Sequence, residues 1–205
     1  LGVVSPSVDL GFLGAPGCPA RVTPDVLQLI SGAAGSIGSE LVRQVSRFHP
    51  KLLLLVDQAE SPLFQLELDQ SARYPRLKAK YLIADVANVE RMKSIFEKYQ
   101  PHYVFHAAAY KHVPLMEENP HEAIRVNVGG IMVLSALAIK YKVRKFVMIS
   151  TDKAVNPTNV MGASKRIAEI YAQRANSTSE TKFITTRFGN VLGSNGSVIP
   201  LFQRQ

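Results

Sequence analysis

Three side chains that can bind or exchange protons follow one another in the second half of the chain. They are Thr151, Asp152 and Lys153. They come directly after an apolar run that ends at Ser150, and the carboxyl end of such a run is where ligands of α/β proteins bind. A helical pattern that begins eleven residues after Ser150 presents Met161 and Lys165 one turn apart on a shared face. The spacing predicts a catalytic site that combines the two segments.

A glycine-rich segment near the start of the chain could bind a phosphate group. Gly32, Gly35 and Gly38 give a G-x-x-G-x-x-G spacing between an apolar run, 26–30, and a helical pattern, 36–48. Such a loop lets the backbone approach a pyrophosphate, which then lies on the N–H groups that begin the helix. Because glycines also serve ordinary turns, the flanking strand and helix carry this prediction.

Two aspartates follow the next two apolar runs and could bind the adenosine half of a dinucleotide. Asp57 lies 19 residues beyond Gly38, near the distance expected for an acid that binds the ribose. Its alternative role is that of a turn residue before the next helix. No arginine follows Asp57 directly, so NAD is favoured over NADP, whose 2′-phosphate a carboxylate would repel. Asp85 is either an adenine neighbour or, with Asn88, the start of a helix.

The chain around these residues alternates short apolar runs with longer amphipathic segments. The predicted strands are 26–30, 52–56, 81–84, 103–106, 146–150 and 183–186. The predicted helices are 36–48, 61–72, 89–99, 117–141, the last as one helix or two abutting ones, and 161–175. Continuously apolar strands between helices predict a parallel sheet that is covered on both faces. The fold class is therefore α/β, a Rossmann-like doubly wound sheet, with 1–25 as a linker or trimmed segment and 26–205 as the NAD(P)-binding catalytic domain.

The composition restricts the class of protein and of partner. The 205 residues are 46% hydrophobic and carry a formal net charge of +8. The basic residues are scattered and no nucleic-acid motif accompanies them, so an anionic small substrate explains the charge better than nucleic acid. The single Cys18 has no partner at metal-ligand spacing, which favours a reducing compartment and no metal site. The longest apolar stretch, 128–139, is shorter than the roughly 20 residues of a membrane span.

Five segments together resemble one enzyme family. They are 32–38, 57–61, 106–114, 150–157 and 187–200, and the resemblance covers most of 31–205. It is to the bacterial polysaccharide-biosynthesis dehydratases, which are UDP-N-acetylglucosamine 4,6-dehydratases of the extended short-chain dehydrogenase/reductase type. The resemblance implies a cytoplasmic homo-oligomer that acts on a UDP-sugar and reaches a membrane only through segments that this chain lacks. It also implies that the family's C-terminal substrate subdomain lies beyond 205.

The resemblance assigns a role to each candidate residue. Thr151 would bind the 4-oxygen of the sugar, Asp152 would act as the acid and Lys153 as the base. Lys165 would hold the nicotinamide ribose. Together with the glycine loop, the resemblance predicts a cofactor site made of Gly32, Gly35, Ser36, Ile37, Gly38, Asp57, Asp85, Val86, Ala107, Ala108 and Lys165. The residues predicted to contact the substrate are Lys111, His112, Arg187 and Asn190.

Several of these assignments have a plain structural alternative. Met161 stands where short-chain dehydrogenases carry a tyrosine, and a thioether cannot transfer a proton. The resemblance includes a long, membrane-anchored branch with this methionine, whereas the alternative is simple core packing. Asp152 and Lys153 could be a solvated ion pair. Lys111 could be a surface charge, His112 a buried residue with hydrogen-bonded nitrogens, and the glycines of 193–196 a turn.

The sequence also leaves two other functions open. A nucleotide-sugar epimerase on the same scaffold would oxidise carbon 4 without loss of water, and the adjacent acid and base favour the dehydratase. A regulator that senses a dinucleotide would not need Thr151, Asp152, Lys153 and Lys165 together. The chain departs from the family pattern at 127–131, where Asn-Val-x-Gly-Thr ends in Ile131.

Overall fold

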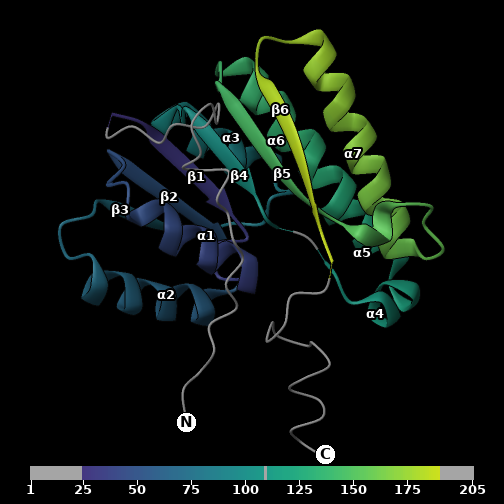
Figure 1. Cartoon of the computed structure of the whole chain (residues 1–205), viewed down its shortest axis with the longest axis horizontal. Helices are drawn as coiled ribbons and strands as arrows, with labels where there is room; N and C mark the ends of the chain where they lie inside the picture. The colour runs from purple at the N-terminus through teal and green to yellow at the C-terminus, as the bar shows by residue number, and fades with distance from the viewer. Residues whose placement is uncertain (1–24, 109, 190–205) are drawn as a thin grey trace, which may run out of the picture.

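A six-stranded parallel sheet forms the centre of the computed structural model, which describes residues 25–108 and 110–189 (Figure 1). The strands are β1 (Leu27–Ser31), β2 (Leu52–Asp57), β3 (Ala79–Ile83), β4 (Tyr103–His106), β5 (Lys145–Thr151) and β6 (Lys182–Phe188). They lie in the order β3-β2-β1-β4-β5-β6, and every neighbouring pair is parallel. All six predicted strands are confirmed, with ends that move by one to two residues.

Helices cover both faces of this sheet (Figure 1). They are α1 (Ser36–Ser46), α2 (Glu60–Arg73), α3 (Val89–Tyr99), α4 (Val113–Glu118), α5 (Pro120–Ala123), the π-helical η2 (Ile124–Gly129), α6 (Gly130–Lys140), the 3₁₀ turn η3 (Asp152–Ala154) and α7 (Val160–Thr178). One hydrophobic cluster joins the sheet to α1 and α2, and another joins it to α3, α6 and α7. The chain is therefore a Rossmann-fold domain, as the alternating pattern predicted.

The apolar strands are explained by burial on two sides. In β2, Leu53 and Leu55 belong to the cluster under α1 and α2, while Leu54 and Val56 belong to the opposite cluster. All four side chains are fully buried. Successive side chains of a strand point to opposite faces, so a strand covered on both faces has no polar positions in its interior.

The segment predicted as one helix or two, 117–141, differs from that expectation. A short helix, α4, begins earlier, at Val113, and ends at Glu118. After Asn119 a second helix begins at Pro120 and continues through η2 into α6. Proline fits the first turn of a helix, where its missing N–H costs nothing, so Pro120 marks the new start.

The same helix is longer than the 128–139 stretch suggested. Within the described part of the chain, 120–140 has the length and the mean hydropathy, 1.5, of a membrane-crossing helix. Half of its most apolar window is buried inside the domain, and α6 packs against α3 and α7. This burial accounts for the apolar composition, as it does for the core helix of any large α/β domain.

The order of the strands determines where a ligand-binding crevice forms. β1 is followed by α1 on one face of the sheet, whereas β4 is followed by α4 and η2, on the other face with α3. The carboxyl ends of β1 and β4 are adjacent, with Ser31 beside His106. Chains that leave neighbouring strands in opposite directions open a crevice, and ligands of doubly wound folds bind there.

Candidate functional site

The glycine loop closes tightly against the end of β4. Gly32 has φ +70°, and a Cβ on it would lie 2.5 Å from the backbone nitrogen of Ala108. A Cβ on Gly38 would lie 1.8 Å from the carbonyl oxygen of Gly32. Gly35 differs, because only that same oxygen, at 3.4 Å, lies near its missing Cβ. Gly32 and Gly38 therefore allow backbone to pack on backbone, and Gly35 leaves open space above the loop.

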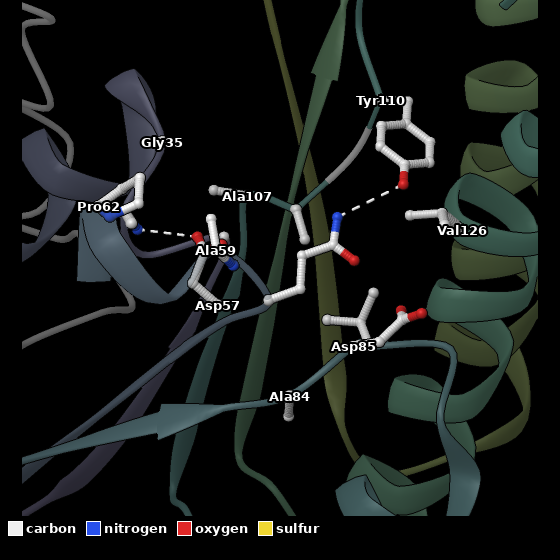
Figure 2. A pocket seen from close by; sticks show the side chains of 14 residues that line it. Gly35, Asp57, Ala59, Pro62, Ala84, Asp85, Ala107, Tyr110 and Val126 are labelled. Carbon is white, nitrogen blue, oxygen red and sulfur yellow. Dashed lines mark hydrogen bonds between the residues drawn. The ribbon is translucent and has the colours of Figure 1, made fainter. Parts of the chain in front are cut away.

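A pocket of about 290 Å³ opens at this loop, beside the carboxyl ends of β1, β2, β3 and β4. Of the predicted cofactor residues, it is lined by Gly32, Gly35, Asp57, Asp85, Val86, Ala107 and Ala108. Ser36, Ile37, Gly38 and Lys165 are not among its lining residues. Figure 2 shows Gly35 and Asp57 on one side and Asp85, Tyr110 and Val126 on the other. Next to the pocket, α1 begins with no acidic residue in its first turn and no side-chain cap, which suits a phosphate.

Asp57 holds two loops that border the pocket. One carboxylate oxygen accepts the backbone N–H of Ala34 at 2.9 Å, and the other accepts that of Ala59 at 2.9 Å. The side chain thus joins the glycine loop to the start of α2. This position of Asp57 is compatible with both predicted roles, an acid that binds the ribose and a residue that supports a turn.

Asp85 is held from two directions at the far side of the pocket. It accepts the backbone N–H of Ala87 at 2.9 Å and the Arg125 guanidinium at 2.6 Å. Arg125 also binds Glu122. The helix start itself is capped by Asn88, which accepts the N–H of Arg91. Sequence reasoning did not identify Arg125, because 40 residues separate it from Asp85 and only the fold brings them together.

Two further lining residues reach across the pocket. The side-chain amide of Gln58 donates to the Tyr110 hydroxyl at 3.5 Å (Figure 2). The backbone of Tyr110 is fixed by buried Asn127, whose side chain accepts the Tyr110 N–H at 2.9 Å and donates to its carbonyl at 3.1 Å. Asn127 also donates to Ser164 at 3.0 Å. It therefore ties the loop after β4 to α7, a role that was missed although the 127–131 pattern pointed to it.

The departure at the end of that pattern has a packing reason. Ile131 is fully buried in the core of the α3, α6 and α7 face. Just before it, a Cβ on Gly130 would lie 2.8 Å from a methyl group of Val86. The segment thus supports the pocket wall from behind.

The predicted catalytic triplet forms a compact turn at the carboxyl end of β5. The Thr151 hydroxyl donates to Asp152 Oδ1 at 3.0 Å, and Lys153 Nζ donates to the same oxygen at 3.3 Å. The Lys153 N–H donates to Thr151 Oγ1 at 3.3 Å. The hydrogen bond from Thr151, assisted by Lys153, holds the pKa of Asp152 below its ordinary value. The side chains of Asp152 and Lys153 are 56% and 36% exposed, which an ion pair at the surface would also show.

α7 brings Lys165 behind this turn. Asn159 caps the helix by accepting the N–H of Gly162 at 2.8 Å. A Cβ on Gly162 would lie 2.3 Å from the carbonyl oxygen of Lys153, so the helix begins directly against the turn of Thr151, Asp152 and Lys153. Lys165 is buried, and its ammonium donates to the carbonyl oxygen of Ile149 at 2.8 Å. Burial lowers the pKa of Lys165 to about 8.

Met161 lies in a separate apolar cluster at the start of α7. It is 3% exposed and packs with Met116 and Ala123, with Tyr110 at the edge of the cluster. This environment is the one that the core-packing alternative requires.

The predicted substrate residues that the structure describes lie in two separate places. Lys111 and His112 are both exposed residues before α4, and desolvation of the Lys111 ammonium lowers its pKa. Arg187 in β6 binds the buried Glu169 through both ends of its guanidinium. Asn190 and the 193–196 loop lie outside the described residues, as does Cys18.

Comparison with known proteins places this geometry in a family. The family model described as "Polysaccharide biosynthesis protein" matches residues 28–205. The capsular polysaccharide biosynthesis protein CapD of Staphylococcus aureus is 52% identical over 179 residues, which are 86% of this chain and 30% of CapD. A UDP-glucose 4-epimerase of Rickettsia canadensis is 42% identical, over 88% of this chain and 53% of the relative. A UDP-N-acetylglucosamine 4,6-dehydratase (inverting) of Campylobacter jejuni is 35% identical, over 86% and 52%.

Solved structures agree with the fold and the family. The structure of Pen from Bacillus thuringiensis has a TM-score of 0.82 and 40% sequence identity, and the match covers 90% of this chain and 56% of Pen. The chain spans from about a third to about half of the length of these relatives. With a Rossmann fold, a glycine-loop pocket and a family match over 28–205, the chain belongs to the polysaccharide biosynthesis protein family, whose relatives include nucleotide-sugar dehydratases and epimerases.

Proposed function

We propose that this chain is the dinucleotide-binding and catalytic part of a nucleotide-sugar 4,6-dehydratase that acts on UDP-N-acetylglucosamine. The observation that carries the proposal is the turn of Thr151, Asp152 and Lys153. In this turn the Thr151 hydroxyl and the Lys153 ammonium both donate to Asp152 Oδ1. Lys165 lies behind this turn at the start of α7. The similarity to dehydratases such as that of Campylobacter jejuni supports the reaction class.

The pocket fits a nicotinamide dinucleotide. The crevice lies above a loop in which Gly32 has a positive φ, and it holds an open space at Gly35 next to an uncapped helix start. Gly32, Gly35, Asp57, Asp85 and Val86 would hold the adenosine and pyrophosphate half. We propose NAD⁺ over NADP⁺, because the Asp57 carboxylate would lie near a 2′-phosphate and repel it. When bound, the dinucleotide would supply a reversible hydride acceptor.

Each residue of the turn would serve a different step of the reaction. Thr151 would hydrogen-bond the 4-oxygen of the sugar and pass the proton of the 4-hydroxyl to solvent as carbon 4 gives up its hydride. Lys165 would bind the nicotinamide ribose. The resulting 4-keto group acidifies the proton on carbon 5, which Lys153 would remove. Asp152 would then protonate the 6-hydroxyl, which leaves as water. Return of the hydride to carbon 6 and of the proton from Lys153 to carbon 5 would complete a 4-keto-6-deoxy sugar, with no net oxidation.

Asp152 must hold a proton to act as this acid, although its pKa is low in the free protein. The main cause of the low pKa is the hydrogen bond from Thr151. If Thr151 turns toward the 4-oxygen of the sugar, this hydrogen bond is lost, and the pKa of Asp152 rises. Substrate binding would then prepare the acid that elimination needs.

The second candidate is a nucleotide-sugar 4-epimerase, and the 42% identity to the Rickettsia protein favours it. An epimerase also oxidises carbon 4 and needs Thr151 and Lys165. It does not expel the 6-hydroxyl, so it has no use for an acid over carbon 6. The two functions therefore differ in what they require of Asp152.

The test compares full-length protein with Asp152→Asn in a single turnover, with cofactor absorbance and sugar NMR as the two readouts. We expect the variant to bind UDP-N-acetylglucosamine and to let bound NAD⁺ be reduced. Formation of the 4-keto-6-deoxy sugar should fall by a factor on the order of 10²–10⁴. Asp69→Asn, a change at an exposed acid on α2, is the control and should behave as wild type. Equal turnover with NADP⁺ would contradict the cofactor assignment.

Two other outcomes would exclude the dehydratase. A wild-type product that is epimerised at carbon 4 and keeps its 6-hydroxyl, also formed by Asp152→Asn, would establish the epimerase. No cofactor reduction in wild-type protein would leave a protein that binds a dinucleotide without turnover.

A further inference from the structure

Glu169, in the middle of α7, is a fully buried carboxylate surrounded by cations. Its side chain is 0% exposed. The Arg187 guanidinium binds it with two hydrogen bonds, at 2.8 Å to Oε1 and 2.6 Å to Oε2. Arg166 donates to Oε2 at 3.0 Å. The side chains of Arg166 and Arg187 are 41% and 40% exposed, so the anion is the desolvated member of the cluster.

A third cation lies one helical turn before Glu169. Lys165 precedes it by four residues, and residues four apart share a helix face. Lys165 is 5% exposed, and its hydrogen bond goes to a neutral acceptor, the carbonyl oxygen of Ile149. Burial lowers the pKa of Lys165, while the charge of Glu169 raises it. The buried His106 of β4 also faces this lysine.

Glu169, and not His106, supplies the charge that acts on Lys165. His106 is fully buried, and burial together with Lys165 lowers its pKa to about 3. The imidazole is therefore neutral near pH 7 and supplies no charge to its neighbour. Among the described groups that face Lys165, Glu169 is the anion.

We propose that Glu169 is a positioning residue of the catalytic site, which keeps Lys165 in place as a cation and joins α7 to β6 through Arg187. As far as it concerns the cofactor, this inference rests on the proposed function. Arg187 then serves to neutralise and orient Glu169, instead of contacting the substrate as the sequence suggested. The same clamp fixes β6, the strand that leads into the residues after 189.

The cluster explains why the carboxylate is needed. Without its charge, Lys165, Arg166 and Arg187 would be three cations around a dry space, and the least hydrated of them would release its proton. That cation is Lys165, which is buried, whereas both arginine side chains are about 40% exposed. A neutral Lys165 would no longer attract a ribose hydroxyl as an ammonium group does.

The test measures the protonation of Lys165 directly, without cofactor, in full-length protein labelled with ¹³Cε-lysine. Lys165→Arg identifies its resonance. We expect the midpoint of its NMR titration to lie near pH 8 in wild type. In Glu169→Gln it should fall by about one pH unit or more, because a neighbouring anion is lost. Glu169→Asp should recover much of the change, and the exposed Glu180→Gln should leave the midpoint unmoved.

A second variant moves the titration in the other direction and covers the case in which Glu169→Gln fails to fold. Arg187→Met removes a competing cation, so Glu169 acts on Lys165 more strongly and the midpoint should rise. A folded Glu169→Gln with the wild-type midpoint, or an Arg187→Met midpoint that does not rise, would overturn the proposal.

Calorimetry of NAD⁺ across the same pH range separates this inference from the proposed function. Affinity should fall as the pH rises through the Lys165 midpoint, and this fall should begin at lower pH in Glu169→Gln. A shifted lysine midpoint with NAD⁺ affinity that is independent of pH would contradict the cofactor role of Lys165. The positioning of Lys165 by Glu169 would still be established by the NMR titration.

Discussion

The three glycines of the first βα loop serve two physical purposes. Gly32 and Gly38 allow backbone segments to pack at distances that no side chain would permit. Gly35 has room for a methyl group in the protein itself and faces the pocket. A glycine motif read from the sequence treats the three alike, although two of them shape the fold and one leaves space for a ligand.

This division predicts opposite effects of two alanine substitutions. Gly38→Ala should lower the free energy of unfolding by about 2 kcal/mol or more, because its Cβ would meet the Gly32 carbonyl oxygen. Gly35→Ala should change it by less than about 1 kcal/mol, yet weaken NAD⁺ binding roughly tenfold by filling the pocket floor. Urea denaturation and calorimetry give the two quantities. Equal loss of stability in both variants would contradict the assignment.

Single residues could be predicted where their neighbours are close in sequence. Thr151, Asp152 and Lys153 contact one another because they are consecutive, so the turn that they form could be anticipated. The ion pair between Arg187 and Glu169 could not be predicted in this way. It depends on the register that sets Arg187 beside Ser150 in the sheet and on the face that α7 turns toward β6. Charge type alone made Arg187 look like a ligand for phosphate.

At the scale of elements, the start of α7 packs against the turn of Thr151, Asp152 and Lys153, which we propose to be catalytic. Asn159 caps the helix from within, and Glu117 of α4 accepts the N–H of Val160 at 2.7 Å. Gly162 then allows the first turn of the helix to lie against the carbonyl oxygen of Lys153. Three elements thus meet at one helix end, and Lys165 follows one turn later.

Gly162→Ala should therefore displace α7 from the turn, since its Cβ would lie 2.3 Å from that oxygen. We expect dehydration by the full-length protein to fall by on the order of 10²-fold, because small misplacement of a catalytic group is costly. Gly129→Ala is the matched control, because the nearest atom to its Cβ would be 3.9 Å away. It should keep activity and gain up to about 1 kcal/mol of stability. Wild-type turnover by Gly162→Ala would show that the contact is not needed.

The hydrophobic pattern predicted the strands and helices better than it predicted the breaks within them. The strands were visible because burial on two faces leaves them apolar throughout. The break at Asn119 and the π-helical turn before Gly130 were not, since both lie inside one continuous helical pattern. The π-helical turn carries Asn127, whose side chain holds the loop after β4. Its local geometry depends on that tertiary contact, which hydrophobic periodicity does not encode.

At the scale of the whole molecule, the two halves of the sheet meet at β1 and β4. Ser31 and His106 lie beside each other there, with Ser31 Oγ 2.9 Å from His106 Nδ1. Both side chains are buried directly under the crevice where the loops diverge. The center of the fold thus contains a polar pair whose charge state is coupled to folding.

That pair predicts how stability depends on pH. In the folded protein burial lowers the pKa of His106 to about 3, whereas the ordinary value is 6.5. Between pH 6.5 and 3 the unfolded chain therefore binds a proton at this residue that the folded chain excludes. Because of this difference, the free energy of unfolding should fall with decreasing pH, by up to about 1.4 kcal/mol per pH unit from this residue.

His106→Asn removes this titration while keeping a polar side chain opposite Ser31. The variant should be less stable than wild type near pH 7.5, because it leaves a space between β4 and Phe146, whose ring packs on His106. Its loss of stability between pH 6.5 and 4.5 should nevertheless be smaller, since other acidic and basic groups titrate alike in both proteins. Urea denaturation at each pH measures this slope. His49→Asn, at an exposed histidine, should lose stability in parallel with wild type. If His106→Asn also runs parallel to wild type, the buried imidazole does not carry the acid sensitivity of the fold.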